Sequence, residues 1–243
     1  MVTIPMRNTF VLAMALGISM GLAGCASSRP GFSTRPLEEL LQRACAPGQD
    51  LREVSGSVWM KVASRESSGQ FPAQVRAVEG KRVDLEVTNL LGGVEARIHV
   101  DEAGYQLDLP GKKGRQASQE RGEGHWGGIP LTWAPDLFLG RVPCPPRARW
   151  SELKYERTAL GGVKATLPAR LGGGQESFEY SFRRFEGEPW PETLVWTQSG
   201  AFARQVTFQM DDPEKGSSSP RKIVAKSDLG EVKIRWTRRD LTR

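Results

Sequence analysis

The residue whose surroundings point most clearly to a chemical role is Cys25, which ends the tetrad Leu-Ala-Gly-Cys at residues 22–25. A thiol is the soft nucleophile that attachment of a lipid requires, and small residues before it are typical of a cleavage site for export. Arg7 supplies positive charge upstream, and residues 10–20 form an almost wholly apolar run. This order indicates a signal peptide over residues 1–24.

The tetrad resembles the bacterial lipobox, which implies that the signal is cut before Cys25 and that Cys25 carries acyl chains such as palmitate. The alternative is an ordinary secretory signal with a chance cysteine. Each buried methylene contributes roughly 0.8 kcal/mol, so several chains on one cysteine would hold the protein on a membrane. Ala26 and Ser27 follow with no aspartate, which by resemblance to the enterobacterial sorting rule indicates the periplasmic face of the outer membrane.

Two further cysteines, Cys45 and Cys144, would face an oxidising compartment after export, where a disulfide can form. The sequence leaves open whether they come close enough to pair. A bridge would close a loop of about 100 residues, which is worth up to roughly 4.7 kcal/mol in the chain-entropy model.

We find no pattern that predicts catalysis or a cofactor. His99 and His125 lack the neighbouring cysteines or carboxylates of a metal site, and Ser151-x-x-Lys154 lacks the companion motifs of penicillin-interacting enzymes. The net charge of +6 is spread along the chain, and export excludes nucleic acid as a partner. The sequence therefore offers no candidate catalytic residue, and we expect no metal and no cofactor.

The lipid would be joined to the fold by a flexible tether, residues 25–35, rich in Ser, Gly and Pro. One domain, residues 36–243, would follow. Apolar residues spaced at i, i+3, i+4 and i+7 predict an amphipathic helix from Pro36 to about Cys45.

After residue 51 the apolar period changes to two, which predicts a meander of antiparallel strands. We expect strands at residues 54–62, 70–77, 83–88, 94–100, 105–109, 150–157, 163–169, 177–185, 192–198, 202–210, 222–227 and 231–237. Residues 110–127 are expected to form a mobile loop, and residues 128–141 one or two short apolar helices. The fold class is thus mainly β: a strongly curved, incomplete antiparallel barrel of about 11 strands, enclosing an apolar cavity beneath a short helical lid.

Three segments resemble the outer-membrane lipoprotein receptor LolB and its wider LolA/LolB-like fold. Residues 88–92, Thr-Asn-Leu-Leu-Gly, are similar to that family's Thr-Asn-Pro-Leu-Gly turn, with Leu90 in place of the proline. Residues 128–140 are similar to its lid, and residues 220–236 to its closing hairpin. The resemblance implies a binding protein rather than an enzyme. It would be a monomer that holds the acyl chains of lipoproteins or lipids and accepts them from a periplasmic carrier protein.

The resemblance also implies that Leu90 and Leu91 form a membrane-insertion loop, with Leu91 at the position of the family's exposed leucine. The alternative for Leu91 is a turn residue packed beneath the sheet. For the acyl cavity we expect Val58, Met60, Leu85, Val87 and Ile98 from the strands, and Leu131, Trp133, Leu137 and Phe138 from the lid. The alternative is that these nine residues are ordinary core.

We therefore expect an outer-membrane lipoprotein that binds acyl chains and helps deliver them to the membrane. An accessory envelope lipoprotein that uses the same fold to bind a protein partner is the alternative. An envelope hydrolase is a third reading, but the sequence shows no convergent acid, base and nucleophile.

Overall fold

The structure is a computed structural model that describes residues 32, 34–64, 68–80, 82–111, 118–122, 124–126, 128–169, 174–200, 203–214 and 216–243. The expected signal peptide, Cys25 and most of the tether lie outside these residues. The compact unit begins at Gly31. Among the described helices, none has the length and apolar character needed to cross a membrane.

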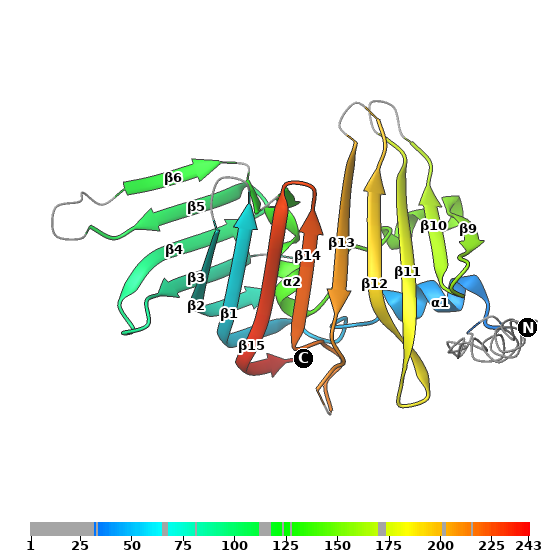
Figure 1. Cartoon of the computed structure of the whole chain (residues 1–243), viewed down its shortest axis with the longest axis horizontal. Coiled ribbons are helices and arrows are strands. Elements are labelled where there is room, and N and C mark those ends of the chain that lie inside the picture. The colour runs from blue at the N-terminus through cyan, green and yellow to red at the C-terminus, as the bar shows by residue number, and fades with distance from the viewer. Residues whose placement is uncertain are drawn as a thin grey trace, which may run out of the picture. The chain divides into compact units, whose positions relative to one another are not determined.

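Thirteen antiparallel strands form one sheet, in the order β6-β5-β4-β3-β2-β1-β15-β14-β13-β12-β11-β10-β9 (Figure 1). Within each half of this order, paired strands follow one another along the chain, and the pairing of β1 with β15 joins the two halves. The bounds are β1 Glu53–Ser64, β2 Ser68–Val78, β3 Arg82–Thr88, β4 Val94–Asp101, β5 Gly104–Leu109, β6 Ser118–Gly122, β9 Lys154–Arg157, β10 Val163–Leu167, β11 Glu176–Phe185, β12 Glu188–Gln198, β13 Arg204–Met210, β14 Lys222–Ser227 and β15 Gly230–Thr242.

The sheet curves without closing. Strands β10 to β13 run upright in Figure 1, whereas β3 to β6 run almost across the view. Within the described strands, β6 and β9 are the two edges and do not pair with each other. A sheet of this size must curl or split, so the predicted incomplete barrel is confirmed, with 13 strands rather than about 11.

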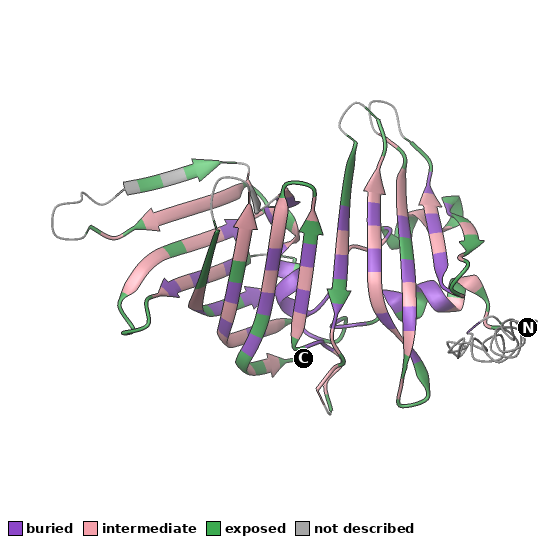
Figure 2. Ribbon diagram, viewed as in Figure 1, coloured by how far each residue is buried: buried purple, intermediate pink, exposed green. Residues whose placement is uncertain are grey.

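Side chains alternate between a buried and a more exposed face along most strands (Figure 2). In β3, for example, Val83, Leu85 and Val87 are buried while Asp84 and Glu86 are only half-buried. This alternation confirms the period-two reading of the sequence, and it assigns the hydrophobic core to one face of the sheet.

Two helical segments cover this core face, behind the sheet as drawn in Figure 1. Helix α1, Leu37–Ala44, is the amphipathic helix that the sequence predicted, and it buries Leu40, Leu41 and Ala44. It packs on β9, β10 and β12. The second segment contains the short hairpin of β7, His125–Trp126, and β8, Ile129–Pro130, then the 3-10 turn η1, Leu131–Trp133, and helix α2, Ala134–Leu139. Helix α2 packs on β1, β2 and β3.

Three sequence expectations need correction. Residues 118–122 of the expected mobile loop form the edge strand β6, while residues 112–117 lie outside the described part. The strand expected from Trp150 begins only at Lys154, because the 3-10 helix η2, Arg147–Glu152, occupies the start of that range. Phe32, assigned to the tether, is buried and packs edge-on against Phe182 of β11 with ring centroids 6.2 Å apart.

Candidate functional site

The turn between β3 and β4 holds two large apolar side chains in solvent. We call residues 89–93 the leucine turn. Leu90 is 82% exposed and Leu91 is 96% exposed. The alternative in which Leu91 packs beneath the sheet is therefore not the arrangement in the structure.

Asn89 organises the leucine turn from its first position. Its side-chain oxygen accepts hydrogen bonds from the backbone N–H groups of Leu91 and Gly93, both at 2.9 Å, and its side-chain amide donates to Glu95 at 2.8 Å. Gly92 adopts a φ of 82°, in the left-handed region that glycine tolerates best. The turn is thus held in one conformation by local bonds, as asparagine turns commonly are, and both leucines point away from the core.

A large side chain exposed in this way can gain free energy only by contact with another apolar phase. Burying a leucine completely contributes roughly 1.5–3 kcal/mol. The leucine turn can therefore supply a contact with a bilayer or an apolar partner at little structural cost.

The lid is the second part of the candidate site, and we define it as residues 128–141. Pro135 lies in the first turn of α2, where its missing N–H costs nothing, and Gly140 ends the helix with a φ of 84°. A methyl group on Gly140 would collide with the hydroxyl of Ser219 and with Pro220. The last turn of α2 is therefore seated closely on the chain that precedes β14.

Aromatic contacts fasten the lid to the sheet. The Trp133 ring meets Trp196 of β12 edge-on, at a centroid distance of 4.9 Å, and lies 5.8 Å from Phe208 of β13. Phe138 meets Trp236 of β15 edge-on at 6.1 Å. Such pairs contribute about 0.5–1.5 kcal/mol each beyond the area they bury.

All nine residues predicted for the acyl cavity belong to one apolar cluster between sheet and lid. Seven are buried and two are half-buried: Val58, Met60, Leu85, Val87, Leu131, Leu137 and Phe138, then Ile98 and Trp133. The structure thus brings the predicted strand and lid residues together, with the lid closed over the strands. Their role in holding an acyl chain stays a prediction.

A buried arginine fixes the carboxyl end of the lid. Arg141 is 7% exposed, and its guanidinium donates to the carbonyls of Gly48 at 3.0 Å and Leu51 at 2.7 Å. It also forms ion pairs with Glu79 at 2.8 Å and Asp136 at 3.3 Å. These partners satisfy the charge in a buried place, where an unpaired arginine would be costly. Sequence reasoning missed this residue.

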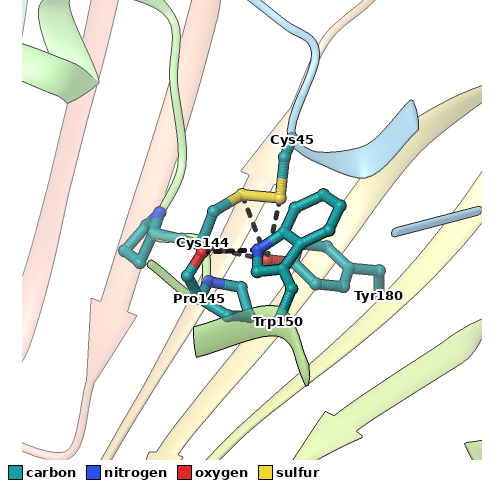
Figure 3. Close-up of a disulfide and its surroundings, with 6 residues drawn as sticks. Cys45, Cys144, Pro145, Trp150 and Tyr180 are labelled. Carbon is teal, nitrogen blue, oxygen red and sulfur yellow. Dashed lines mark hydrogen bonds between the residues drawn. A yellow bond between two sulfur atoms is a disulfide. The ribbon is translucent and has the colours of Figure 1, made fainter. Parts of the chain in front are cut away.

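A disulfide joins Cys45, at the end of α1, to Cys144, just beyond the lid, with the two Cα atoms 6.0 Å apart (Figure 3). The Tyr180 hydroxyl donates to the carbonyl of Pro143 at 2.8 Å and lies 3.4 Å from the sulfur of Cys144. Burial raises the pKa of Tyr180 well above its ordinary value. Because the phenol stays protonated, it remains a donor to the segment that carries the disulfide.

The fixed end of the lid contrasts with the end that begins it. Residues 140–144 are held by Arg141 and by the disulfide. At the other end, a side chain on Gly128 would meet Ser227, the last residue of β14, and Leu229 of the turn that follows. The backbone N–H of Leu131 donates to the carbonyl of Gly124. Within the described residues, the disulfide therefore restrains the carboxyl end of the lid and not the end at which the lid begins.

Within the described residues, the remaining polar groups do not assemble a metal centre. The His99 ring lies 2.7 Å from a carboxylate oxygen of Asp84 and 3.3 Å from one of Asp101, on the charged face of the sheet. No group of three or more possible metal ligands is found there or elsewhere in the described part. Ser151 lies in η2 and Lys154 begins β9, and the side chain of His125 is not described.

No protein-family model matches the chain, and no curated protein matches its sequence. Solved structures align with most of it. A LolA superfamily protein from Nitrosomonas europaea shares 11% identity at a TM-score of 0.46, covering 86% of this chain and 94% of that one. A domain named as an outer membrane lipoprotein-sorting protein, from Vibrio parahaemolyticus, shares 7% at 0.46 and covers 84% and 91%.

A further alignment is with lipoprotein LppX of Mycobacterium tuberculosis, at 12% identity and a TM-score of 0.32, covering 82% of this chain and 92% of that one. The Nitrosomonas europaea protein is described as a member of the LolA superfamily, and the sequence motifs resemble the LolA/LolB-like fold.

Proposed function

We propose that this protein is a lipid-anchored protein of the outer membrane that binds acyl chains of lipoproteins or lipids beneath its lid and helps deliver them to the bilayer. The leucine turn carries the proposal. Leu91 is 96% exposed, and the hydrogen bonds of Asn89 hold it there. A protein that works only in water gains nothing from two leucines presented in this way, whereas one that meets a bilayer does.

The cargo would occupy the space that lid side chains fill in the structure. Phe138 and the strand residue Val58 are at most 1% exposed, so an acyl chain can reach the strands only after the lid moves away. Since Arg141 and the disulfide hold the far end of the lid, opening would start around Leu131 and Trp133 and hinge near Gly140. The acyl chain would then replace apolar contacts of the lid with its own.

No covalent chemistry is needed for such a transfer. Acyl chains would pass from a periplasmic carrier to this interior, and then to the bilayer, along increasing apolar affinity. We therefore propose a binding protein rather than an enzyme. The acyl chains proposed on Cys25 would keep it at the membrane that receives the cargo.

The closed interior favours one alternative, an accessory lipoprotein that binds a protein partner. Because the lid aromatics fill the space beneath it, the domain could be a rigid body whose exposed leucines meet an apolar patch of another protein. In this alternative the lid never opens.

Native mass spectrometry of the chain from residue 26 onward, purified without detergent, separates these two functions. The carrier function predicts bound acyl species in stoichiometric amount and uptake of a fluorescent fatty acid. The Leu91→Glu variant serves as the control, because it should bind acyl chains like the unchanged protein while delivering them poorly. An empty protein that also fails to take up the fatty acid would favour the partner-binding alternative.

A further inference from the structure

The charged face of the sheet, opposite the lid, has a region in which like charges face each other. Around β2 to β4, cations face acids across neighbouring strands: Arg76 meets Glu53 at 2.8 Å, and Arg97 meets Glu86 at 3.1 Å. The exception lies on β1, β15 and β14, which are adjacent near the middle of the sheet (Figure 1).

On these three strands, two pairs of like charges stand directly opposite each other. Lys61 of β1 faces Lys233 of β15, and Arg235 of β15 faces Lys222 of β14. Side chains in this relation have Cβ atoms about 4.5–5.5 Å apart, and like charges there are destabilising. A sequence free to vary has no structural reason to keep both pairs.

Among the described residues, an acidic side chain lies near the members of these two pairs on β1 and β14, but not near the members on β15. Lys222 pairs with Asp211 at 3.0 Å, and Lys61 lies 4.0 Å from Glu231. Lys233 and Arg235 form no ion pair with any residue that the structure describes. The two central cations are therefore available to an anion from outside.

Three of the four cations, Lys61, Lys233 and Arg235, line a groove of about 200 Å³. Trp59, Lys61, Gln70, Lys233 and Arg235 line it, together with Met60, and we call it the basic groove. Apolar groups flank the groove. Trp59 stands opposite Arg235 and Pro72, and Val224 stands opposite Lys233.

We propose that the basic groove binds a phosphate group, and that its source is the headgroup of an anionic phospholipid. The guanidinium of Arg235 can donate two parallel hydrogen bonds to phosphate oxygens, while Lys61 and Lys233 add point charges. A free phosphate ion would not need the neighbouring apolar groups. A tryptophan beside cations suits the glycerol region of a lipid, which is apolar on one side and wet on the other.

This proposal is independent of the acyl-binding function, because the groove lies on the face opposite the lid. Val58 and Met60, which alternate with Trp59 and Lys61, point into the core under the lid. A headgroup in the groove would lie outside the sheet, and acyl cargo would lie inside it.

The test is isothermal titration calorimetry of the full chain in a neutral detergent, with three water-soluble ligands. Glycerophosphoglycerol represents the anionic headgroup, glycerophosphocholine a headgroup without net charge, and inorganic phosphate the free ion. We expect glycerophosphoglycerol to bind more tightly than the other two. The double variant Lys233→Gln/Arg235→Gln should weaken its binding at least about tenfold, which corresponds to about 1.4 kcal/mol.

The matched control is Lys154→Gln/Lys164→Gln, which removes two cations from β9 and β10. Lys164 stands between Glu156 and Glu179, so its charge is already matched. This variant should bind the headgroup normally and melt at a lower temperature. The groove variant should melt no lower than the unchanged protein without ligand, because it removes like-charge pairs.

Equal headgroup binding by the unchanged protein and the groove variant would overturn the site. Equal loss in the control variant would also overturn it, since binding would then reflect net charge alone. Inorganic phosphate that binds as tightly as glycerophosphoglycerol would overturn the lipid headgroup as its source.

Discussion

At the scale of single residues, the leucine turn divides two roles between different side chains: some fix its backbone, and others are presented to solvent. Leu90 and Leu91 contribute little to the core, while Asn89 and Gly92 fix the backbone that presents them. Substitutions of the leucines should therefore change what the turn touches and leave the fold intact. Substitution of Asn89 should change how firmly the turn is held.

Leu91→Glu tests contact with the bilayer. It should slow transfer of an acylated, fluorescent cargo to vesicles by up to roughly 10- to 100-fold, since burying a leucine contributes roughly 1.5–3 kcal/mol. The free energy of unfolding should stay within about 0.5 kcal/mol, as for other exposed sites. Leu160→Glu is the control, because Leu160 is also exposed, at 67%, but lies in the β9–β10 turn. Transfer at the normal rate by Leu91→Glu would refute a role in delivery.

Asn89→Ala tests the organisation of the turn. The two backbone N–H groups of Leu91 and Gly93 lose their acceptor, and net loss of a hydrogen bond costs about 0.5–1.5 kcal/mol. Hydrogen exchange at these two amides should quicken while exchange in the core strands stays the same. Asn89→Asp keeps the acceptor oxygen and should protect both amides. Equal exchange in the two variants would show that the side chain does not hold the turn.

At the scale of elements, the lid is set by the residues that end it. Gly140 combines a φ of 84° with close contact to Ser219 and Pro220, so an added side chain meets both a conformational and a steric penalty. Arg141 then ties the lid to Gly48 and Leu51, far away in sequence. These contacts make the carboxyl end of the lid the firm one.

Gly140→Ala should destabilise the protein more than Gly80→Ala. Both glycines have positive φ, for which alanine pays roughly 1–2 kcal/mol, but a methyl group on Gly80 meets open space. The collision at Gly140 should add about 1–3 kcal/mol, as overpacking does. Chemical denaturation of both variants measures the difference. An equal loss of unfolding free energy in both variants would mean that Ser219 and Pro220 can move to accommodate a methyl group.

The disulfide should be a large contributor to stability. It closes a loop with a sequence separation of 99, and a loop of that length is worth up to roughly 4.7 kcal/mol in the chain-entropy model. Cys45→Ser/Cys144→Ser should lower the free energy of unfolding toward that extent. A reducing agent should have the same effect on the unchanged protein and none on the variant. If reduction left the unchanged protein as stable as before, the bridge would be absent or without effect.

Elements with a strong apolar period were predictable from the sequence, and elements without one were not. Strand β3 buries every apolar residue that its period assigns inward, and helix α1 buries three of four, with Leu37 half-buried. Strand β6 reads Ser-Gln-Glu-Arg-Gly and carries no such period, because an edge strand is held by backbone pairing to β5 alone. The prolines before η2 set a 3-10 turn where the apolar pattern favoured a strand.

The candidate site shows the same division. The lid could be located because its prolines and glycine mark local backbone geometry. The leucine turn was located because residues 88–92 resemble the turn of a known family. The partners of Arg141, and the approach of Cys45 to Cys144, join segments that are distant in sequence. Local patterns carry no signal for such pairs, so the sequence left the disulfide open and gave no sign of the buried arginine.

At the scale of the whole molecule, the two faces of one sheet are suited to different parts of a lipid. The core face, with the lid over it, offers apolar side chains, whereas the opposite face carries the basic groove. If both proposals hold, the protein would hold acyl chains on one side while the other side meets anionic headgroups. The leucine turn, between β3 and β4, would enter the bilayer beyond the headgroups.

Attachment to the membrane should nevertheless depend on Cys25. Two leucines contribute roughly 1.5–3 kcal/mol each when fully buried. An acyl chain contributes roughly 0.8 kcal/mol for each buried methylene, so several chains on one cysteine exceed the leucine turn by a wide margin. Cys25→Ala should therefore move the protein from membranes to the soluble fraction, while Leu91→Glu should leave it attached.

Fractionation of cells in high salt measures this distribution, because salt weakens contacts with anionic headgroups and leaves an acyl anchor in place. The double variant Cys25→Ala/Leu91→Glu should fractionate like Cys25→Ala alone, since the turn touches the bilayer without anchoring the chain. Continued attachment of Cys25→Ala in high salt would argue against the lipid on Cys25. Release of that attachment by adding Leu91→Glu would then make the leucine turn the anchor itself.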